Sequence, residues 1–184
     1  MKKPLFLKKI NEGVYYFNKI NPYVDRKIID FIIQDSEKNQ FKRSRICTHQ
    51  NSKSKLHEMF ISIQRDSYIR PHKHLKKDES YFLLKGNLDI IIFNHNGEIK
   101  EIICLTDRGK NKKIYYKLLK NTMHTIVIKS KYVVIQEVAL GPFNKNNDVF
   151  ANFSPNEIEK GKIILYKKML NKKIKKFKLI NVKN

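Results

Sequence analysis

The stretch RPHKHLKKDESYFLLKG, residues 70–86, combines two histidines one residue apart with a glutamate and a closing glycine. Residues two apart on a β-strand point to the same side, so His72 and His74 would project together towards one ion. Glu79 follows across a short lysine-rich loop and shares a strand face with Tyr81. The alternative is a solvated loop, because polar side chains among lysines are mostly exposed.

A third imidazole is available at His124, which opens the segment HTIVI. Three neutral imidazoles and one carboxylate suit a borderline divalent ion such as Fe, Mn, Zn or Ni, and also Co or Cu. His72, His74, Glu79 and His124 are therefore candidate metal ligands.

The hydrophobic pattern around this stretch predicts an all-β domain. Between residues 42 and 138 apolar side chains recur with a period of two, as in LHEMFISIQ, where His57 falls on the apolar face. NLDIIIF and EIKEIICL flank NHNG, which predicts a hairpin because Asn-Gly tolerates the positive φ of a tight turn. HTIVI and KYVVIQEV flank residues 129–130, which predicts a second hairpin. Many short strands without intervening helices predict a sandwich or barrel.

Two segments outside the strand region have helical patterns. Residues 22–38 place Val24, Ile28, Phe31 and Ile32 on one stripe, with a proline suited to the opening turn at position 22. Residues 160–184 contain ten lysines and no acidic residue. The apolar side chains at helical spacing in this second segment are Ile163, Tyr166, Leu170, Ile174 and Phe177. This stripe predicts packing on the barrel or, alternatively, a basic amphipathic helix for a polyanion or a membrane surface.

The composition describes a folded and strongly basic chain. Of its 184 residues 41% are hydrophobic, and the formal net charge is +22. Because the lysines are spread along the chain, composition bias is favoured over a nucleic-acid partner, while a polyanionic partner stays open. Cys47 and Cys104 form no CxxC pair, which favours a reducing compartment. No apolar run reaches the length of a signal-peptide core or a membrane span, so we expect a cytoplasmic protein without a transmembrane segment.

The spacing H-x-H-x4-E-x6-G in residues 72–86 resembles the first signature of the cupin superfamily. His124 stands where the second signature has its single histidine. Two departures are Asp66, in place of the usual opening glycine, and Asn121, in place of the glycine of a Pro-x-Gly turn. Asparagine can replace glycine in a left-handed turn. The resemblance implies a cupin double-stranded β-helix, or jelly roll, that binds a divalent metal ion through the four candidate ligands.

A narrower resemblance covers most of residues 22–155. The order of its motifs is similar to that of the WbuC-type cupin-fold metalloproteins, and these motifs are FKRSRICTH, PHKHLKKDES, HT and QEVALGPF. That family is often associated with O-antigen and other surface-polysaccharide gene clusters. The resemblance implies a jelly roll with a short N-terminal helix, a small sugar-like ligand and, since cupins commonly dimerise, a homodimer. We expect an N-terminal helical segment in residues 1–40, the cupin barrel in 41–155 and a lysine-rich C-terminal extension in 156–184.

Glu137 is the candidate catalytic residue. If residues 129–130 form a two-residue turn, His124 lies opposite Ile135, and Glu137 points the same way as His124. A carboxylate there could orient a ligand histidine or serve as a general base. The alternative is a solvent-facing glutamate at the barrel mouth.

Five further residues are candidate substrate-binding groups. Arg43, Arg45 and His49 alternate, and arginine forks bind carboxylate or phosphate groups in a bidentate manner. The resemblance favours an anionic substrate site over plain surface arginines. His57 either lines the pocket or is a satisfied core histidine, and Tyr81 either offers a phenol to the cavity or packs in the core.

Together these patterns predict a cupin-fold protein that binds a divalent metal ion and acts on, or binds, a small polar ligand. As an enzyme it would be a metal-dependent isomerase, epimerase, lyase or oxygenase, because the fold alone does not determine the reaction. The alternatives are a non-catalytic ligand-sensing cupin and a polyanion-binding protein that uses its basic tail.

Overall fold

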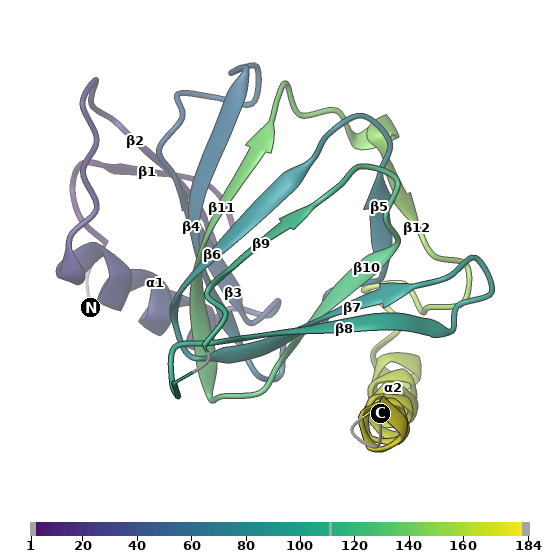
Figure 1. Cartoon of the computed structure of the whole chain (residues 1–184). Helices are drawn as coiled ribbons and strands as arrows, with labels where there is room; N and C mark the ends of the chain where they lie inside the picture. Colours follow the sequence, from purple (N-terminus) through teal and green to yellow (C-terminus); the bar gives the residue numbers. More distant parts are fainter. Residues whose placement is uncertain (1–2, 111, 182–184) are drawn as a thin grey trace.

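The computed structural model describes residues 3–110 and 112–181, which form two facing β-sheets and two α-helices (Figure 1). One sheet has seven strands in the order β1-β2-β3-β4-β11-β6-β9, and the other has five in the order β12-β5-β10-β7-β8. The elements are β1 (Leu7–Asn11), β2 (Val14–Phe17), α1 (Arg26–Lys38), β3 (Arg43–Cys47), β4 (Leu56–Gln64), β5 (His72–His74), β6 (Glu79–Lys85), β7 (Asn87–Phe93), β8 (Ile99–Thr106), β9 (Tyr115–Leu118), β10 (His124–Ile128), β11 (Tyr132–Leu140), β12 (Asp148–Phe150) and α2 (Lys160–Asn181), with a 3-10 turn at Lys145–Asn147.

The strand pairs are nested around one hairpin. β7 pairs with β8, and outward from this pair β6 pairs with β9, β5 with β10 and β4 with β11, all antiparallel. The chain from β4 to β11 is therefore arranged as one long antiparallel hairpin that is rolled up, so that some of its strand pairs lie in one sheet and the others in the second sheet. This nested pairing defines the jelly roll, and the all-β cupin double-stranded β-helix expected from the sequence is confirmed.

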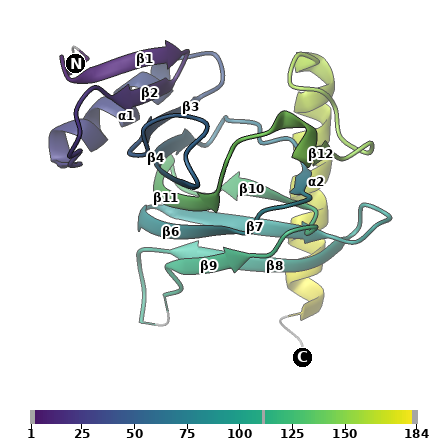
Figure 2. The ribbon, with the colours of Figure 1, turned by 90° about the horizontal axis from the view of Figure 1, so that it is seen from above.

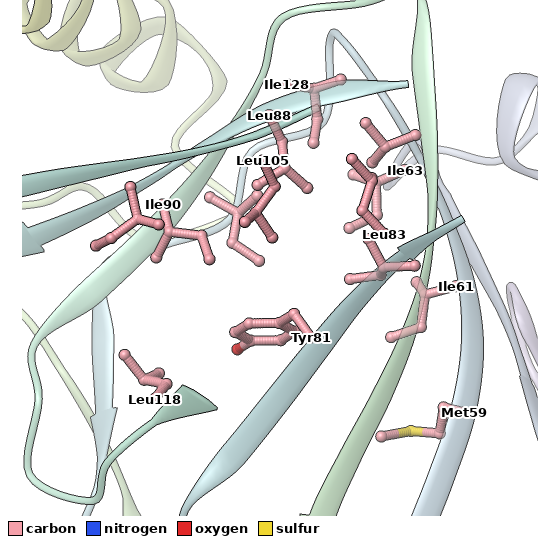
Figure 3. Packing of buried hydrophobic residues seen from close by; sticks show 14 of the residues in the cluster. Met59, Ile61, Ile63, Tyr81, Leu83, Leu88, Ile90, Leu105, Leu118 and Ile128 are labelled. Carbon is pink, nitrogen blue, oxygen red and sulfur yellow. The ribbon is translucent and has the colours of Figure 1, made fainter. Parts of the chain in front are cut away.

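The main hydrophobic core lies between the two sheets (Figure 3). The seven-stranded sheet contributes side chains such as Ile61, Ile63 and Leu83, and the five-stranded sheet contributes Leu88 and Ile90 among others. These residues occupy alternate positions of their strands, because successive side chains of a strand point to opposite faces. The period of two in the sequence thus arises from a core that covers one face of each sheet.

One of the two predicted hairpins is correct. The NHNG segment joins β7 to β8, and Gly97 has the positive φ of +76° that this turn requires. The second prediction, a hairpin across residues 129–130, is wrong. β10 pairs with β5 and β7, whereas β11 pairs with β4 and β6 in the other sheet.

The reason is that residues 129–130 carry the chain from one sheet to the other. The Lys129 amide donates to the Asn87 carbonyl at 2.8 Å, and the Ser130 hydroxyl donates to the Tyr132 carbonyl at 2.6 Å. His124 and Ile135, which the predicted hairpin would have paired, therefore lie on strands of different sheets. Alternation predicts which face of a strand is buried but does not determine its partner strand.

Helix α1 lies on the outer face of the seven-stranded sheet (Figure 2). It begins at Arg26, because the side chain of Asp25 accepts a hydrogen bond from the Ile28 amide at 3.0 Å and caps the helix. The start predicted at residue 22 is thus four residues too early. The cluster between the helix and the sheet comprises Leu7, Tyr15, Ile28, Phe31, Ile32 and Ile46.

The sequence does not predict strands β1 and β2. β1 buries Leu7 and leaves its other four residues exposed, so it has no alternating pattern. β2 pairs in parallel with β3 and thereby extends the seven-stranded sheet. The division of the chain at residues 40 and 155 stays a prediction.

Helix α2 lies on the outside of the five-stranded sheet (Figures 1 and 2). Its buried residues Tyr166, Leu170 and Ile174 form a cluster with Ile91 and Phe93 of β7. The apolar stripe seen in the sequence is therefore the packing face of this helix. Within the described residues, neither helix has the length and the apolar character needed to cross a membrane.

Candidate metal centre

Three imidazoles meet at one end of the five-stranded sheet. His72 and His74 lie on β5 and His124 opens β10, the neighbouring antiparallel strand, where it is directly opposite His72. One ligand nitrogen from each ring lies within 4.8 Å of the other two. His74 and His124 are buried and His72 is partly buried. The strand periodicity of the H-x-H segment thus directs both β5 imidazoles to the same point.

Each imidazole is oriented by a hydrogen bond at Nδ1. The Nδ1 of His72 is 2.8 Å from the Arg70 carbonyl oxygen, and that of His124 is 3.0 Å from the Thr122 carbonyl oxygen. The Nδ1 of His74 is 2.6 Å from Oδ1 of Asp148. Because all three partners are acceptors, Nδ1–H is the donor in each ring, which leaves Nε2 to face the other imidazoles.

Glu79 adds a carboxylate at the edge of the cluster. Its Oε1 lies 3.0 Å from Nε2 of His74, and its Oε2 lies 4.0 Å from Nε2 of His124. The Tyr81 hydroxyl donates to Oε2 at 2.6 Å, and the Lys77 ammonium is 2.7 Å from Oε1. Nε2 of His74 is nevertheless a buried nitrogen without an aligned hydrogen-bond partner among the described residues.

The charges around His74 favour a cation at this position. Burial lowers the pKa of His74, but the carboxylates of Asp148 and Glu79 outweigh burial and raise it to about 9. Burial raises the pKa of Glu79, but His74 and Lys77 outweigh it and hold that pKa well below its usual range. Burial lowers the pKa of His72, and it lowers that of His124 to about 3, so both rings are neutral.

These residues fit a divalent metal ion. Two neutral imidazoles, a third that carries a displaceable proton, and an ionised carboxylate form the kind of ligand set that borderline ions prefer. Metal binding at histidine displaces protons, and among the imidazoles of this cluster Nε2 of His74 is the buried nitrogen that lacks an aligned partner within the described residues.

Two residues that contact this cluster are not predicted from the sequence. Lys77 lies within the same run as the ligands, and its closeness to Glu79 in sequence is the signal that could have identified it. Asp148 has no such signal, because it comes from β12, which pairs with β5 only in the folded chain. A carboxylate behind a ligand histidine fixes its tautomer and ring orientation.

Glu137 faces the barrel interior, although the hairpin from which this was predicted does not exist. β11 places Glu137 opposite Met59 of β4 and Tyr81 of β6, on the core side of the seven-stranded sheet. Burial and the charge of Glu79 raise the pKa of Glu137 to about 7, while the charges of Lys77 and Arg45 oppose this. The reason for its orientation is its register with the core residues of β4 and β6.

The two arginines of β3 lie at different levels of the barrel. Nη1 of Arg45 is 4.0 Å from the sulfur of Met59, the residue opposite Glu137. In the strand register Arg45 is opposite Ile61 and Arg43 is opposite Ile63, so Arg43 starts about 7 Å further along the strand from Glu137 than Arg45 does. Nη2 of Arg43 is 2.8 Å from Oε1 of Glu157, so its guanidinium is engaged in an ion pair. The structure brings Arg45, but not Arg43, to the level of Glu137.

A cavity of about 280 Å³ opens beside the cluster. It is lined by His57, Lys77 and Asp148 and by the segment from Leu140 to Asn144, among others. The ring of His57 stacks on that of His49, with centroids 4.1 Å apart. His57 therefore both packs against a neighbour and lines a cavity, and Lys77 and Asp148 connect this cavity to Glu79 and His74.

The fold and the site together define a jelly roll of the cupin type with a candidate metal centre. Residues 24–105 match a family model described as "Domain of unknown function (DUF6016)". A comparison with curated protein sequences found no match.

Solved structures resemble the chain at low sequence identity. Pac13 from Streptomyces, described as a unique nucleoside dehydratase, has a TM-score of 0.48 and 13% identity over 66% of this chain and 87% of its own. Protein SO0799 from Shewanella oneidensis has a TM-score of 0.46 and 12% identity over 56% of this chain and 66% of its own. For oxalate decarboxylase from Lactobacillus farciminis in complex with formate, the TM-score is 0.42 and the identity 16% over 54% of this chain and 27% of that protein.

The chain thus spans about a quarter of the decarboxylase and slightly less than two thirds of the Shewanella protein. These are similarities of fold alone. The assignment to the jelly roll comes from the nested strand pairing.

Proposed function

We propose that this protein is a metalloprotein that holds one divalent ion, Fe, Mn, Zn or Ni, on His72, His74 and His124, with Glu79 as the fourth ligand. The observation that carries the proposal is that one ligand nitrogen from each of three imidazoles lies within 4.8 Å of the other two. Each ring is held by a hydrogen bond from its Nδ1 to an acceptor. The buried Nε2 of His74 lacks an aligned hydrogen-bond partner, which is costly, and a bound ion would offset that cost.

The small molecule that the protein would bind in this proposal is polar and carries an anionic group. Lys77 lines the cavity beside the cluster, where it also pairs with Glu79, and Arg45 lies deeper in the barrel at the level of Glu137. Both are cations that can bind a carboxylate or phosphate. The WbuC-type resemblance supports a sugar-like ligand from surface-polysaccharide biosynthesis.

A bound divalent ion would act as a Lewis acid that polarises a carbonyl or hydroxyl of the ligand. Glu137 faces the interior beside Tyr81 and is the group that would accept or return a proton. A glutamate that faced solvent would have favoured the non-catalytic ligand-sensing alternative. Tyr81 would hold the Glu79 carboxylate in place through its hydroxyl.

The test is elemental analysis of the protein purified without chelators, followed by a ligand screen. We expect about one Fe, Mn, Zn or Ni per chain. Nucleotide sugars should then raise the unfolding temperature of the metal-loaded protein more than that of the chelator-treated protein, because a ligand stabilises the state that binds it. Metal-free protein that cannot be loaded by any of these ions would contradict the proposal.

A further inference from the structure

Helix α2 has a second face that the barrel does not use. Its inward stripe, centred on Tyr166, Leu170 and Ile174, packs against the five-stranded sheet. The opposite side of the helix points away from the protein, and α2 lies on the other side of the molecule from α1 and β1 (Figure 2). We propose that this outward face binds the surface of an anionic lipid bilayer.

The first observation is charge. α2 carries nine lysines and no acidic residue. Lys162 pairs with Glu159, Lys178 pairs with Asp89, and Lys167 donates to the carbonyl of Asp66. In the part of the chain that the structure describes, the side chains of the other six lysines of α2 form neither an ion pair nor a hydrogen bond. These are Lys160, Lys168, Lys172, Lys173, Lys175 and Lys176. A row of uncompensated cations of this kind is attracted to acidic headgroups.

The second observation is that aliphatic side chains accompany these lysines. Leu165 is 67% exposed and Leu179 is 70% exposed, and Ile164, Met169 and Ile180 are exposed as well. With Lys172 and Lys176 between them, Leu165, Met169 and Leu179 follow one line along the helix, at the three- and four-residue spacing of a single face. Large aliphatic side chains at this exposure are unfavourable in water and favourable at the boundary between headgroups and acyl chains.

This combination favours a bilayer over a nucleic acid. The phosphate backbone of a nucleic acid is bound by lysine, arginine and polar groups. It provides no apolar surface on which exposed leucines could be buried. A bilayer surface satisfies both kinds of side chain, because lysine heads reach the phosphates while their stems and the neighbouring leucines enter the interface. The 22-residue helix is about 33 Å long and docked along its length, so it can lie flat on such a surface.

The test measures binding of the full chain to vesicles of phosphatidylcholine that contain about one third phosphatidylserine, by flotation at low and at physiological salt. The variants are Lys172→Glu with Lys176→Glu, and Leu165→Asn with Leu179→Asn. The control is Lys8→Glu with Lys9→Glu, an equal charge change on exposed residues of β1. We expect binding to the anionic vesicles and little change in the control. The lysine variant should lose tenfold or more in binding, since each lysine at such a surface contributes roughly fivefold. The leucine variant should also lose tenfold or more, because two large aliphatic side chains no longer enter the interface.

Three results would overturn the proposal. The first is the absence of binding to these vesicles. The second is equal loss in the α2 and control variants, which would mean that net charge alone matters. The third is binding to a DNA or RNA fragment that Lys172→Glu with Lys176→Glu abolishes and Leu165→Asn with Leu179→Asn leaves intact, which would make a nucleic acid the partner. If the glutamate variant unfolds at a lower temperature, Lys172→Gln with Lys176→Gln serves for the same comparison.

Discussion

The Nδ1 atom of His74 lies 2.6 Å from Oδ1 of Asp148, although 74 residues separate them in the chain. Strand β12 places Asp148 opposite His74 of β5, so the carboxylate stands directly behind the imidazole. This contact holds the ring with Nε2 directed at the other two histidines, and it contributes negative charge next to a candidate cation site.

Asp148→Asn should therefore weaken metal binding. The amide keeps the shape of the side chain but loses the charge that supports the His74 ring, and changes of this kind cost about 10- to 100-fold in metal affinity. Competition with a chromophoric chelator measures the effect. Asp66→Asn is the matched control, because Asp66 is exposed and its side chain does not contact the cluster. Equal affinity in the two variants would show that Asp148 does not support the site.

His72→Ala combined with His74→Ala should abolish stoichiometric metal and leave a folded barrel. The core between the sheets comprises apolar side chains such as Ile61 and Leu88, and it does not depend on the ion. Elemental analysis measures the metal, and circular dichroism during heating measures the fold. His95→Ala, in the exposed turn between β7 and β8, should keep its metal. Undiminished metal in the double variant would rule out these ligands.

Leu170→Ala should lower the free energy of unfolding by about 2–4 kcal/mol, because it leaves a cavity between α2 and the five-stranded sheet. Leu165→Ala removes the same atoms from the exposed side of the helix and should change stability by less than about 0.5 kcal/mol. Urea denaturation of the two variants compares them directly. Similar values would mean that α2 does not dock through the stripe described here.

Gly86→Ala should destabilise the protein by about 2–4 kcal/mol. Gly86 has a φ of +97°, and a Cβ there would lie 2.5 Å from the Tyr132 carbonyl oxygen and 2.7 Å from the Ser130 hydroxyl. Strain and overlap both oppose the larger residue. Gly161→Ala is the counterpart, because its Cβ would meet nothing within 4 Å and should stabilise helix α2 by roughly 0.5 kcal/mol. Thermal unfolding of both variants should show shifts of opposite sign.

Local sequence patterns predict much of this protein. The period of two identifies the core-facing residues of β4, and Asn-Gly identifies the β7–β8 turn, because both signals depend on neighbours in the chain. The pairing of His72 with His74 in space follows from strand geometry alone. His124 required the resemblance to cupins, since no local rule relates it to the other two histidines.

Tertiary structure decided the rest. Alternation marks which face of a strand is buried but not which strand lies beside it, so the hairpin predicted at residues 129–130 is a crossover between sheets. Other features also depend on strand pairings that only the folded chain creates. The pairing of β12 with β5 places Asp148 behind His74, and the register of β3 on β4 sets the different levels of Arg43 and Arg45. The mostly exposed strand β1 is a strand only because it pairs with β2. The sequence determined which residues could bind a metal ion, and the contacts across the barrel decided how each imidazole is held.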